Sequence, residues 1–185
     1  MDVLEIIRTR HSIAKVKPDP LPRNLVEKLL NAAVQAPNHH HSRPWRFVVL
    51  TGPGRERLGE VMAQSLKKQK SDLPDSALDI ERAKPLRAPL LIAVGVEKSS
   101  DPRVLEIEDI CAAAAAVENM LLAAHALGLG AMWRTGPPAR DPLVKQFLGF
   151  APDQPLIGFI YVGYPDVQPD FTERPSFEDR TVWVG

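Results

Sequence analysis

"VLEIEDICAAAAAVENMLLAAHALG", residues 104–128, is the longest helical pattern in this chain of 185 residues. From residue 110 to residue 127 its polar residues are Glu118, Asn119 and His125. A helix that is apolar nearly all round lies in the middle of a structure. Five consecutive alanines would let another backbone approach closely, although the high helix propensity of alanine explains them equally well. Gly128 is a suitable C-terminal cap, so we expect a long central helix that ends there.

The apolar residues elsewhere predict helices that alternate with strands. Their spacing indicates helices over 3–10, 25–36, 55–70 and 141–149. Continuous apolar runs indicate strands over 46–50, 89–96, 129–135 and 155–165. The polar residues 71–79 are the best candidate for a mobile lid. Helices and strands in this order predict a mixed fold of α and β elements around one sheet.

Composition and charge exclude several classes of protein. Lysine plus arginine (23) equals aspartate plus glutamate (23), so no net charge attracts nucleic acid or an anionic membrane. A single cysteine excludes an internal disulfide framework. The N-terminus lacks the apolar core of a signal peptide, and no apolar run approaches the ~20 residues that cross a bilayer. We therefore expect one soluble, cytoplasmic domain.

Three adjacent histidines, His39, His40 and His41, raise the question of a metal site. Zinc ligands are spaced so that several side chains converge on one ion, and three adjacent residues do not converge without strain. His11 and His125 are isolated in the sequence, and there is no cysteine pair. We therefore predict no metal site.

No sequence motif for a nucleophile or for a phosphate-binding glycine loop occurs. Cys111 is expected to be buried in the alanine-rich helix and unreactive. An enzyme with this sequence would depend on a cofactor for its chemistry.

Three segments offer the donors and planar rings that an anionic aromatic cofactor needs. Arg10 and Ser12 end the first helix and suit a phosphate monoester, because arginine donates as a fork and serine adds a neutral donor. The second segment is 133–136, at the end of a strand, and the third is the histidine loop before the tryptophan at position 45. Each has an ordinary alternative, since arginines often cap helices in solvent and tryptophans usually lie in the core.

Taken together, these segments resemble the FMN-dependent nitroreductase family, most closely its minimal single-domain members. The matching features are "RHS" (10–12), "APNH" (36–39) before "PWRF" (44–47), "RAPLLIAV" (87–94), the central helix and "WRTG" (133–136). The resemblance implies an α+β nitroreductase-like fold, with a central mixed, largely antiparallel sheet flanked by helices. It also implies a homodimer with FMN at the subunit interface and exchange of the C-terminal strand. Residues 1–165 would form the FMN-binding domain, and 166–185 would extend to the partner subunit with "TVWVG" at the end.

The resemblance also assigns candidate FMN contacts. The motif for the phosphate and ribityl chain matches Arg10, His11 and Ser12. A histidine that contacts FMN from the partner subunit matches His39. A second run that contacts the flavin matches Trp133, Arg134 and Thr135. Two departures from the family pattern, Gln35 and Arg43, are further candidates. Arg43 stands where many members have glutamine, and a cation near the flavin would raise its potential. The alternative is that Arg43 points into solvent. A nicotinamide-nucleotide contact is implied for Ala123, Ala124, His125, Ala126, Leu127 and Gly128.

The activity that the resemblance implies is a ping-pong reaction. NAD(P)H would reduce FMN, which would then reduce a nitroaromatic, quinone or similar small-molecule acceptor, and no catalytic side chain would be required. Three alternatives are a flavin-dependent dehydrogenase or dehalogenase acting on another metabolite, a non-catalytic flavin sensor or storage protein, and a metal-binding protein.

Overall fold

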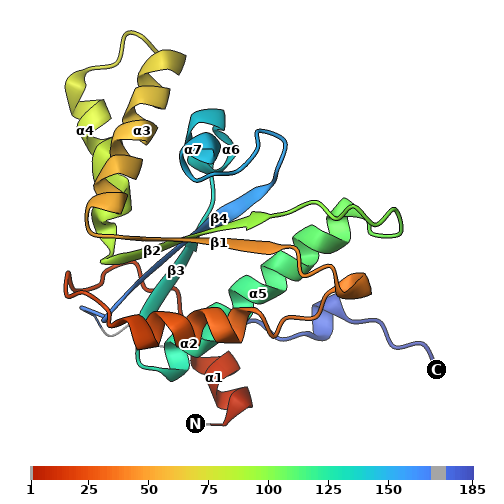
Figure 1. Cartoon of the computed structure of the whole chain (residues 1–185). Coiled ribbons are helices and arrows are strands. Elements are labelled where there is room, and N and C mark those ends of the chain that lie inside the picture. The colour runs from red at the N-terminus through yellow and green to blue at the C-terminus, as the bar shows by residue number, and fades with distance from the viewer. Residues whose placement is uncertain (1, 168–173) are drawn as a thin grey trace.

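The computed structural model describes residues 2–167 and 174–185, and its centre is a four-stranded sheet (Figure 1). The strands are β1 (Trp45–Thr51), β2 (Leu90–Val96), β3 (Gly130–Arg134) and β4 (Leu156–Gly163), in the order β1-β2-β4-β3. All three pairings are antiparallel, which confirms the largely antiparallel sheet. No strand among the described residues runs parallel to a neighbour, so a mixed sheet would need a strand from a second chain.

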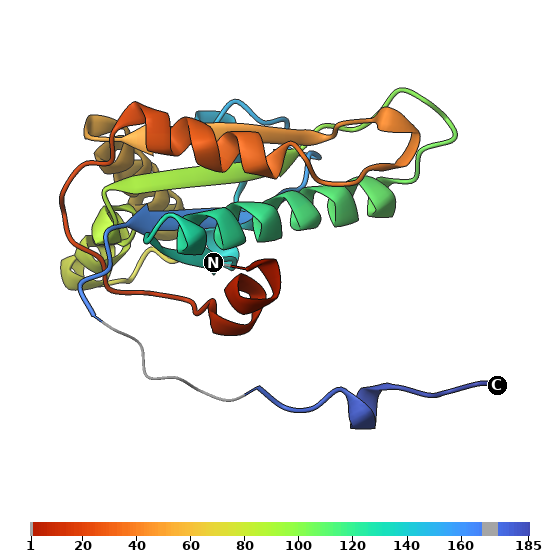
Figure 2. The ribbon, with the colours of Figure 1, turned by 90° about the horizontal axis from the view of Figure 1, so that it is seen from below.

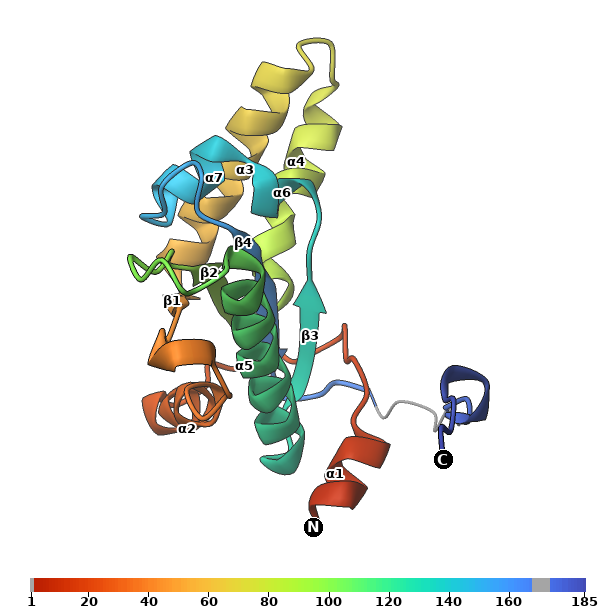
Figure 3. The ribbon, with the colours of Figure 1, turned by 90° about the vertical axis from the view of Figure 1, so that its right-hand side faces the viewer.

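Helices cover both faces of the sheet (Figures 1 and 3). One face carries α2 (Arg23–Ala33) and α5 (Glu106–Ala126), with α1 (Val3–Thr9) beside α5. The other face carries α3 (Pro53–Gln69), α4 (Asp75–Ala83), α6 (Pro137–Arg140) and α7 (Pro142–Phe147). Single turns of 3-10 helix occur at η1 (His39–His41), η2 (Lys84–Arg87) and η3 (Glu178–Arg180).

Strand β2 shows why the fold has two cores. All of its residues are buried, and successive side chains point to opposite faces. Ile92 and Val94 pack with α2 and α5, whereas Leu91 and Ala93 pack with α3 and α7. A strand with helices on both sides has no polar face, so its sequence is a continuous apolar run.

Helix α5 is buried on one side and exposed on the other. Ala113, Ala116 and Met120 face the sheet and are fully buried. Cys111 lies about half a turn from them and is exposed, so the prediction of a buried Cys111 was wrong for the single chain. The sequence is apolar on both sides, and only the packing of α2 and the sheet decides which side is covered. On this side of α5, α1 covers the part near Glu118 and His125, whereas the apolar part around Cys111 stays open in the single chain.

Two predicted segments differ from the structure. Within the segment 71–79, which is predicted to be a mobile lid, α4 begins at Asp75 and packs on α3 through the buried Leu78, and the mobility itself stays a prediction. The C-terminal "TVWVG" forms no strand in the single chain and lies away from the body (Figure 2). Its Val182, Trp183 and Val184 are 85–94% exposed. Part of the predicted extension, 168–173, lies outside the described residues. Among those described, no helix is long and apolar enough to span a membrane.

Candidate functional site

The first candidate segment, Arg10–Ser12, follows α1 and lies against the C-terminal half of α5. The Arg10 Nε atom is 3.3 Å from the Glu118 carboxylate and is buried. The Arg10 side chain is 16% exposed, His11 is half-buried and Ser12 is exposed. The carbonyl of Arg10 accepts a hydrogen bond of 2.8 Å from the guanidinium of Arg174. This end of α1 therefore carries a cation held by α5 and an accessible hydroxyl.

The chain after Ser12 runs along the free edge of β3. The backbone N–H of Ile13 donates to the carbonyl of Ala131 at 2.9 Å. A residue of an antiparallel strand directs its N–H and C=O to the same side, so Ala131 and Trp133 both present backbone groups at this edge. A Cβ atom at Gly130 would meet both Ile13 and Val16. The residues before Ile13 therefore lie toward Trp133, and the first two candidate segments are neighbours in one chain.

The side chains of Trp133 and Arg134 lie on opposite faces of the sheet. Trp133 packs with the core on the α5 side, and its indole N–H donates to the carbonyl of Ile157 at 3.1 Å. The guanidinium of Arg134 lies 5.6 Å from the centre of the Tyr161 ring, on the α3 side. Burial raises the pKa of the Tyr161 hydroxyl, and the charge of Arg134 opposes that rise. Thr135 is exposed where the strand ends.

The third segment, the histidine loop, is fixed to the N-terminal half of α5. The hydroxyl of Ser42 donates to the buried carboxylate of Asp109 at 2.7 Å. The Nδ1 atom of His39 is 3.8 Å from the Glu108 carboxylate. His40, His41 and Arg43 have φ angles of 49°, 54° and 48°, which L-residues adopt only at some cost. The loop is therefore held in one strained shape by contacts to α5.

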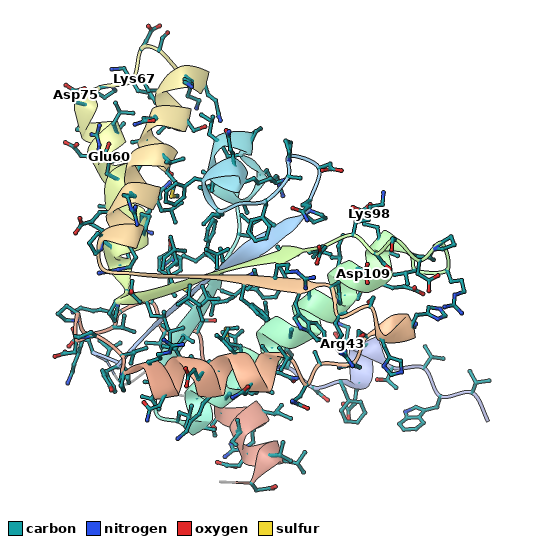
Figure 4. The ribbon with its side chains drawn as sticks, in the orientation of Figure 1. Arg43, Glu60, Lys67, Asp75, Lys98 and Asp109 are labelled. Atoms are coloured by element: carbon teal, nitrogen blue, oxygen red, sulfur yellow. The ribbon has the colours of Figure 1, made fainter. Side chains whose placement is uncertain are left out.

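A hollow of about 390 Å³ lies between this loop and α5, lined by His39, Glu108 and Cys111 among others. The side chains of Gln35 and Arg43 are exposed at the same end of the molecule, and Figure 4 labels Arg43 near Asp109. No group of three or more His, Cys, Asp and Glu side chains that could hold a metal ion occurs within 2–167 and 174–185.

A single chain does not bring all three segments together. Glu108, next to His39, and Glu118, next to Arg10, are ten residues apart on α5, or about 15 Å along its axis. Arg10–Ser12 and Trp133–Thr135 thus form one half of a candidate site, and the loop that carries His39 forms another half at the far end of α5.

Comparison with known proteins identifies the group to which the chain belongs. A model of the Nitroreductase family matches residues 7–164. The chain belongs to the nitroreductase family. The YdjA protein of Escherichia coli K12, which carries the provisional name NAD(P)H nitroreductase, is 36% identical over 169 residues, 91% of each chain. The predicted family, fold class and assignment as an oxidoreductase are thereby confirmed.

Solved structures agree with this assignment. A nitroreductase-like family protein from Bacillus cereus has a TM-score of 0.87 and 27% identity, covering 100% of this nitroreductase and 96% of that chain. A provisionally named nitroreductase from Desulfovibrio desulfuricans was solved in complex with FMN. It has a TM-score of 0.75 and 26% identity, and the match covers 100% of this chain and 98% of that chain.

In this nitroreductase the segment Ala123–Gly128 packs partly against α1. The Nε2 atom of His125 is 2.8 Å from the hydroxyl of Thr9, whereas Ala126 and Gly128 are exposed. Burial lowers the pKa of His125, and the nearby His11 and Arg10 lower it further.

Sequence reasoning missed three residues that hold the candidate segments in place, namely Thr9, Asp109 and Glu118. A signal for Glu118 exists, because it lies seven residues before His125 and therefore on the same face of α5. Asp109 resembles an ordinary acidic residue in the first turn of a helix, and Thr9 resembles an ordinary end of a helix. For these two residues the sequence carries no separate signal.

Proposed function

We propose that this nitroreductase is a homodimer that binds FMN in two equivalent sites and uses NAD(P)H to reduce nitroaromatic, quinone or similar acceptors. The observation that carries the proposal is the division of the candidate contacts between the two ends of α5. A two-fold axis across the middle of α5 places the N-terminal half of one α5 beside the C-terminal half of the other. The partner's histidine loop then meets Arg10–Ser12 and the edge of β3.

The residues at this position fit FMN. The buried Nε atom of Arg10 has no hydrogen-bond partner among the described residues, although Glu118 lies at ion-pair distance. A guanidinium with an unused donor beside an exposed serine hydroxyl suits a phosphate group. The edge of β3 adds the backbone N–H and C=O of Trp133, which suit the hydrogen-bonding edge of a flavin ring.

Bound FMN supplies two-electron transfer between a nicotinamide donor and the acceptor. The chain's own contribution is to bind and orient. Arg10, His11 and Ser12 hold the phosphate and ribityl chain, and the run Trp133–Thr135 orients the ring through its edge. Gln35, His39 and Arg43 reach the ring from the partner subunit. No nucleophilic side chain takes part.

The exposed residues Ala126 and Gly128 are the part of Ala123–Gly128 that is open to a nicotinamide nucleotide. Residues 1–165 form the flavin-binding domain under this proposal, and 166–185 form the extension to the partner subunit.

The free edge of β1 suits the partner's C-terminal "TVWVG". Among the described residues β1 pairs only with β2, and hollows of about 410 and 390 Å³ lie on its two sides, both lined by Val49 and Thr51. Successive side chains of an added strand point to opposite faces. Trp183 would therefore enter one hollow while Val182 and Val184 enter the other. A strand added here removes an exposed apolar tail and an open sheet edge together.

An absorption spectrum between 300 and 550 nm tests the function, recorded before and after anaerobic addition of NADPH or NADH. We expect flavin bands that bleach with a nicotinamide nucleotide and return when a nitroaromatic or quinone is added. Flavin bands that neither nucleotide bleaches would favour a sensor or another donor. A colourless protein that does not take up FMN would contradict the proposal.

A further inference from the structure

We propose that His125 is a positioning residue for the phosphate-binding segment Arg10–Ser12, which it holds through the hydroxyl of Thr9. The inference rests on the proposed function and deepens it. It separates His125 from the nicotinamide contact that the resemblance implies for Ala123–Gly128.

Hydrogen-bond geometry fixes the direction of the contact. The hydroxyl of Thr9 is 2.6 Å from the carbonyl of Glu5 and donates its single proton there. It therefore accepts from His125, whose Nε2 atom is 2.8 Å away. Nε2 must carry a proton for this, which makes the imidazole a donor fixed to the long helix α5. The same nitrogen cannot bind a nicotinamide nucleotide without releasing Thr9.

Thr9 is the last residue of α1, and Arg10 follows it directly. Helix α1 has seven residues and none of them is buried, so apolar packing within one chain holds it weakly. His125 to Thr9 and Glu118 to Arg10 are two side-chain contacts from α5 to consecutive residues at this end of α1. Because Glu118 and His125 lie two turns apart on one face of α5, they hold Thr9 and Arg10 in a fixed line.

The charges around His125 suit a neutral donor. It faces Arg10 and His11 from the end of α1, and burial together with these two groups holds its pKa below the ordinary 6.5. At pH 7 the imidazole is therefore uncharged. A neutral imidazole anchors Thr9 without adding a positive charge beside the guanidinium of Arg10.

The test compares the affinities of the full-length protein for FMN and riboflavin, which differ only in the phosphate. Dissociation constants are measured by quenching of flavin fluorescence on protein stripped of flavin. We expect His125→Ala to weaken FMN binding about tenfold and riboflavin binding less than about twofold, as loss of one positioning hydrogen bond implies. His125→Gln, whose amide N–H can donate to Thr9, should restore most of the FMN affinity.

Thr9→Val provides an independent variant. It removes the same hydrogen bond from the side of Thr9, and it can replace His125→Ala in the test if that variant does not fold. Thr9→Val should weaken FMN binding as His125→Ala does, and the double variant should be no weaker than either one, because the two changes remove one interaction. Glu106→Ala, an exposed change at the far end of α5, is the matched control and should leave both affinities unchanged.

Other results would overturn the inference. Equal weakening of FMN and riboflavin would show general loosening of the fold. If His125→Ala leaves the FMN affinity unchanged and raises the KM for NADPH, His125 would instead be a contact of the nicotinamide nucleotide. Wild-type protein that binds neither flavin would overturn the proposed function and this inference together. Wild-type protein that binds FMN but is not reduced by NAD(P)H would overturn the enzyme alone, and the comparison of variants would still decide the role of His125.

Discussion

At the scale of residues, neighbours in a strand contact different parts of the molecule because their side chains point to opposite faces of the sheet. Trp133 faces the α5 core, and Arg134 stacks on Tyr161 across the sheet. A flavin bound at the edge of β3, as proposed, would therefore meet the backbone of this run before its side chains. The sequence predicts that the run is important, but it does not show that the two large side chains point in opposite directions.

Gly158 is required for the position of Trp133. Its φ angle is 147°, and a Cβ atom would lie 2.4 Å from the indole nitrogen of Trp133. Gly158→Ala should therefore destabilise the protein by about 2–4 kcal/mol, through backbone strain and a clash. Gly128→Ala is the control, because Gly128 has a φ of 72° and no atom within 4 Å of an added Cβ. This change should lower the free energy of unfolding by about 1–2 kcal/mol. Urea unfolding followed by tryptophan fluorescence measures both, and equal costs would contradict the role of Trp133.

His125 should make stability depend on pH in the flavin-free protein. Its folded-state pKa lies below the value of 6.5 for the unfolded chain, so the unfolded state binds more protons between the two values. The free energy of unfolding should thus be constant above 6.5 and fall as the pH drops below it, until the folded pKa is passed. Urea midpoints from pH 7.5 to 5.5 test this for wild type and His125→Gln. A slope of the same size in both proteins would show that other groups cause it.

At the scale of elements, predictions succeed where periodicity alone decides the outcome. Strand β2 and helix α5 match their apolar runs, because both bury residues with a regular period. Predictions fail where a partner decides the outcome. Residues 75–79 are polar enough for a loop, but α3 offers a surface on which Leu78 is buried. "TVWVG" has strand residues but no strand to pair with in its own chain.

Asp141 joins helices α3 and α7 at the start of α7. One carboxylate oxygen accepts from the backbone N–H groups of Leu143 and Val144, and the other accepts from Ser65 and Gln69 of α3. Asp141→Ala should lower the free energy of unfolding by about 2–4 kcal/mol, because α7 loses its N-terminal cap and the donors of Ser65 and Gln69 lose their acceptor.

Asp75→Ala is the matched control, because this exposed aspartate in the first turn of α4 caps nothing and should cost less than about 1 kcal/mol. Thermal unfolding of both variants checks the difference, and similar melting temperatures would count against the role of Asp141.

Trp183 should determine how tightly the C-terminal tail holds the dimer. It is 85% exposed in the single chain, and aromatic side chains dominate the energy of interfaces. Trp183→Ala should raise the dimer dissociation constant at least about tenfold in sedimentation equilibrium. Phe177→Ala changes an exposed aromatic residue of the same tail outside "TVWVG" and should have a smaller effect. An unchanged dimer in Trp183→Ala would argue against exchange of this strand.

At the scale of the whole molecule, the proposed function makes a single subunit incomplete. The two halves of the candidate site lie at opposite ends of α5, and apolar residues remain exposed at both ends, including Leu4 and Ile7 of α1 and Ile107 of α5. A second copy related by a two-fold axis would cover these residues and complete two sites in one step. Assembly and flavin binding should therefore depend on each other.

Mixing two inactive variants tests whether the site is shared. Arg10→Ala and His39→Ala homodimers each lack one contact in both sites. If a site combines Arg10 of one subunit with His39 of the other, the heterodimer has one site with both changes and one intact site. Random assembly of co-expressed variants should then restore roughly one site in four. Flavin content and NADPH oxidation measure the recovery, and no recovery would place both residues in the same subunit's site.

The sequence by itself determines most of the elements, the two-sided burial of the sheet and the residue types of the candidate flavin site, because these follow from periodicity and from short motifs. The tertiary structure decides which side of α5 is open, which faces Trp133 and Arg134 occupy, and that Thr9, Asp109 and Glu118 hold the candidate segments. These are contacts between residues far apart in the chain. No local pattern encodes them, because each depends on the packing of elements that are separate in the sequence.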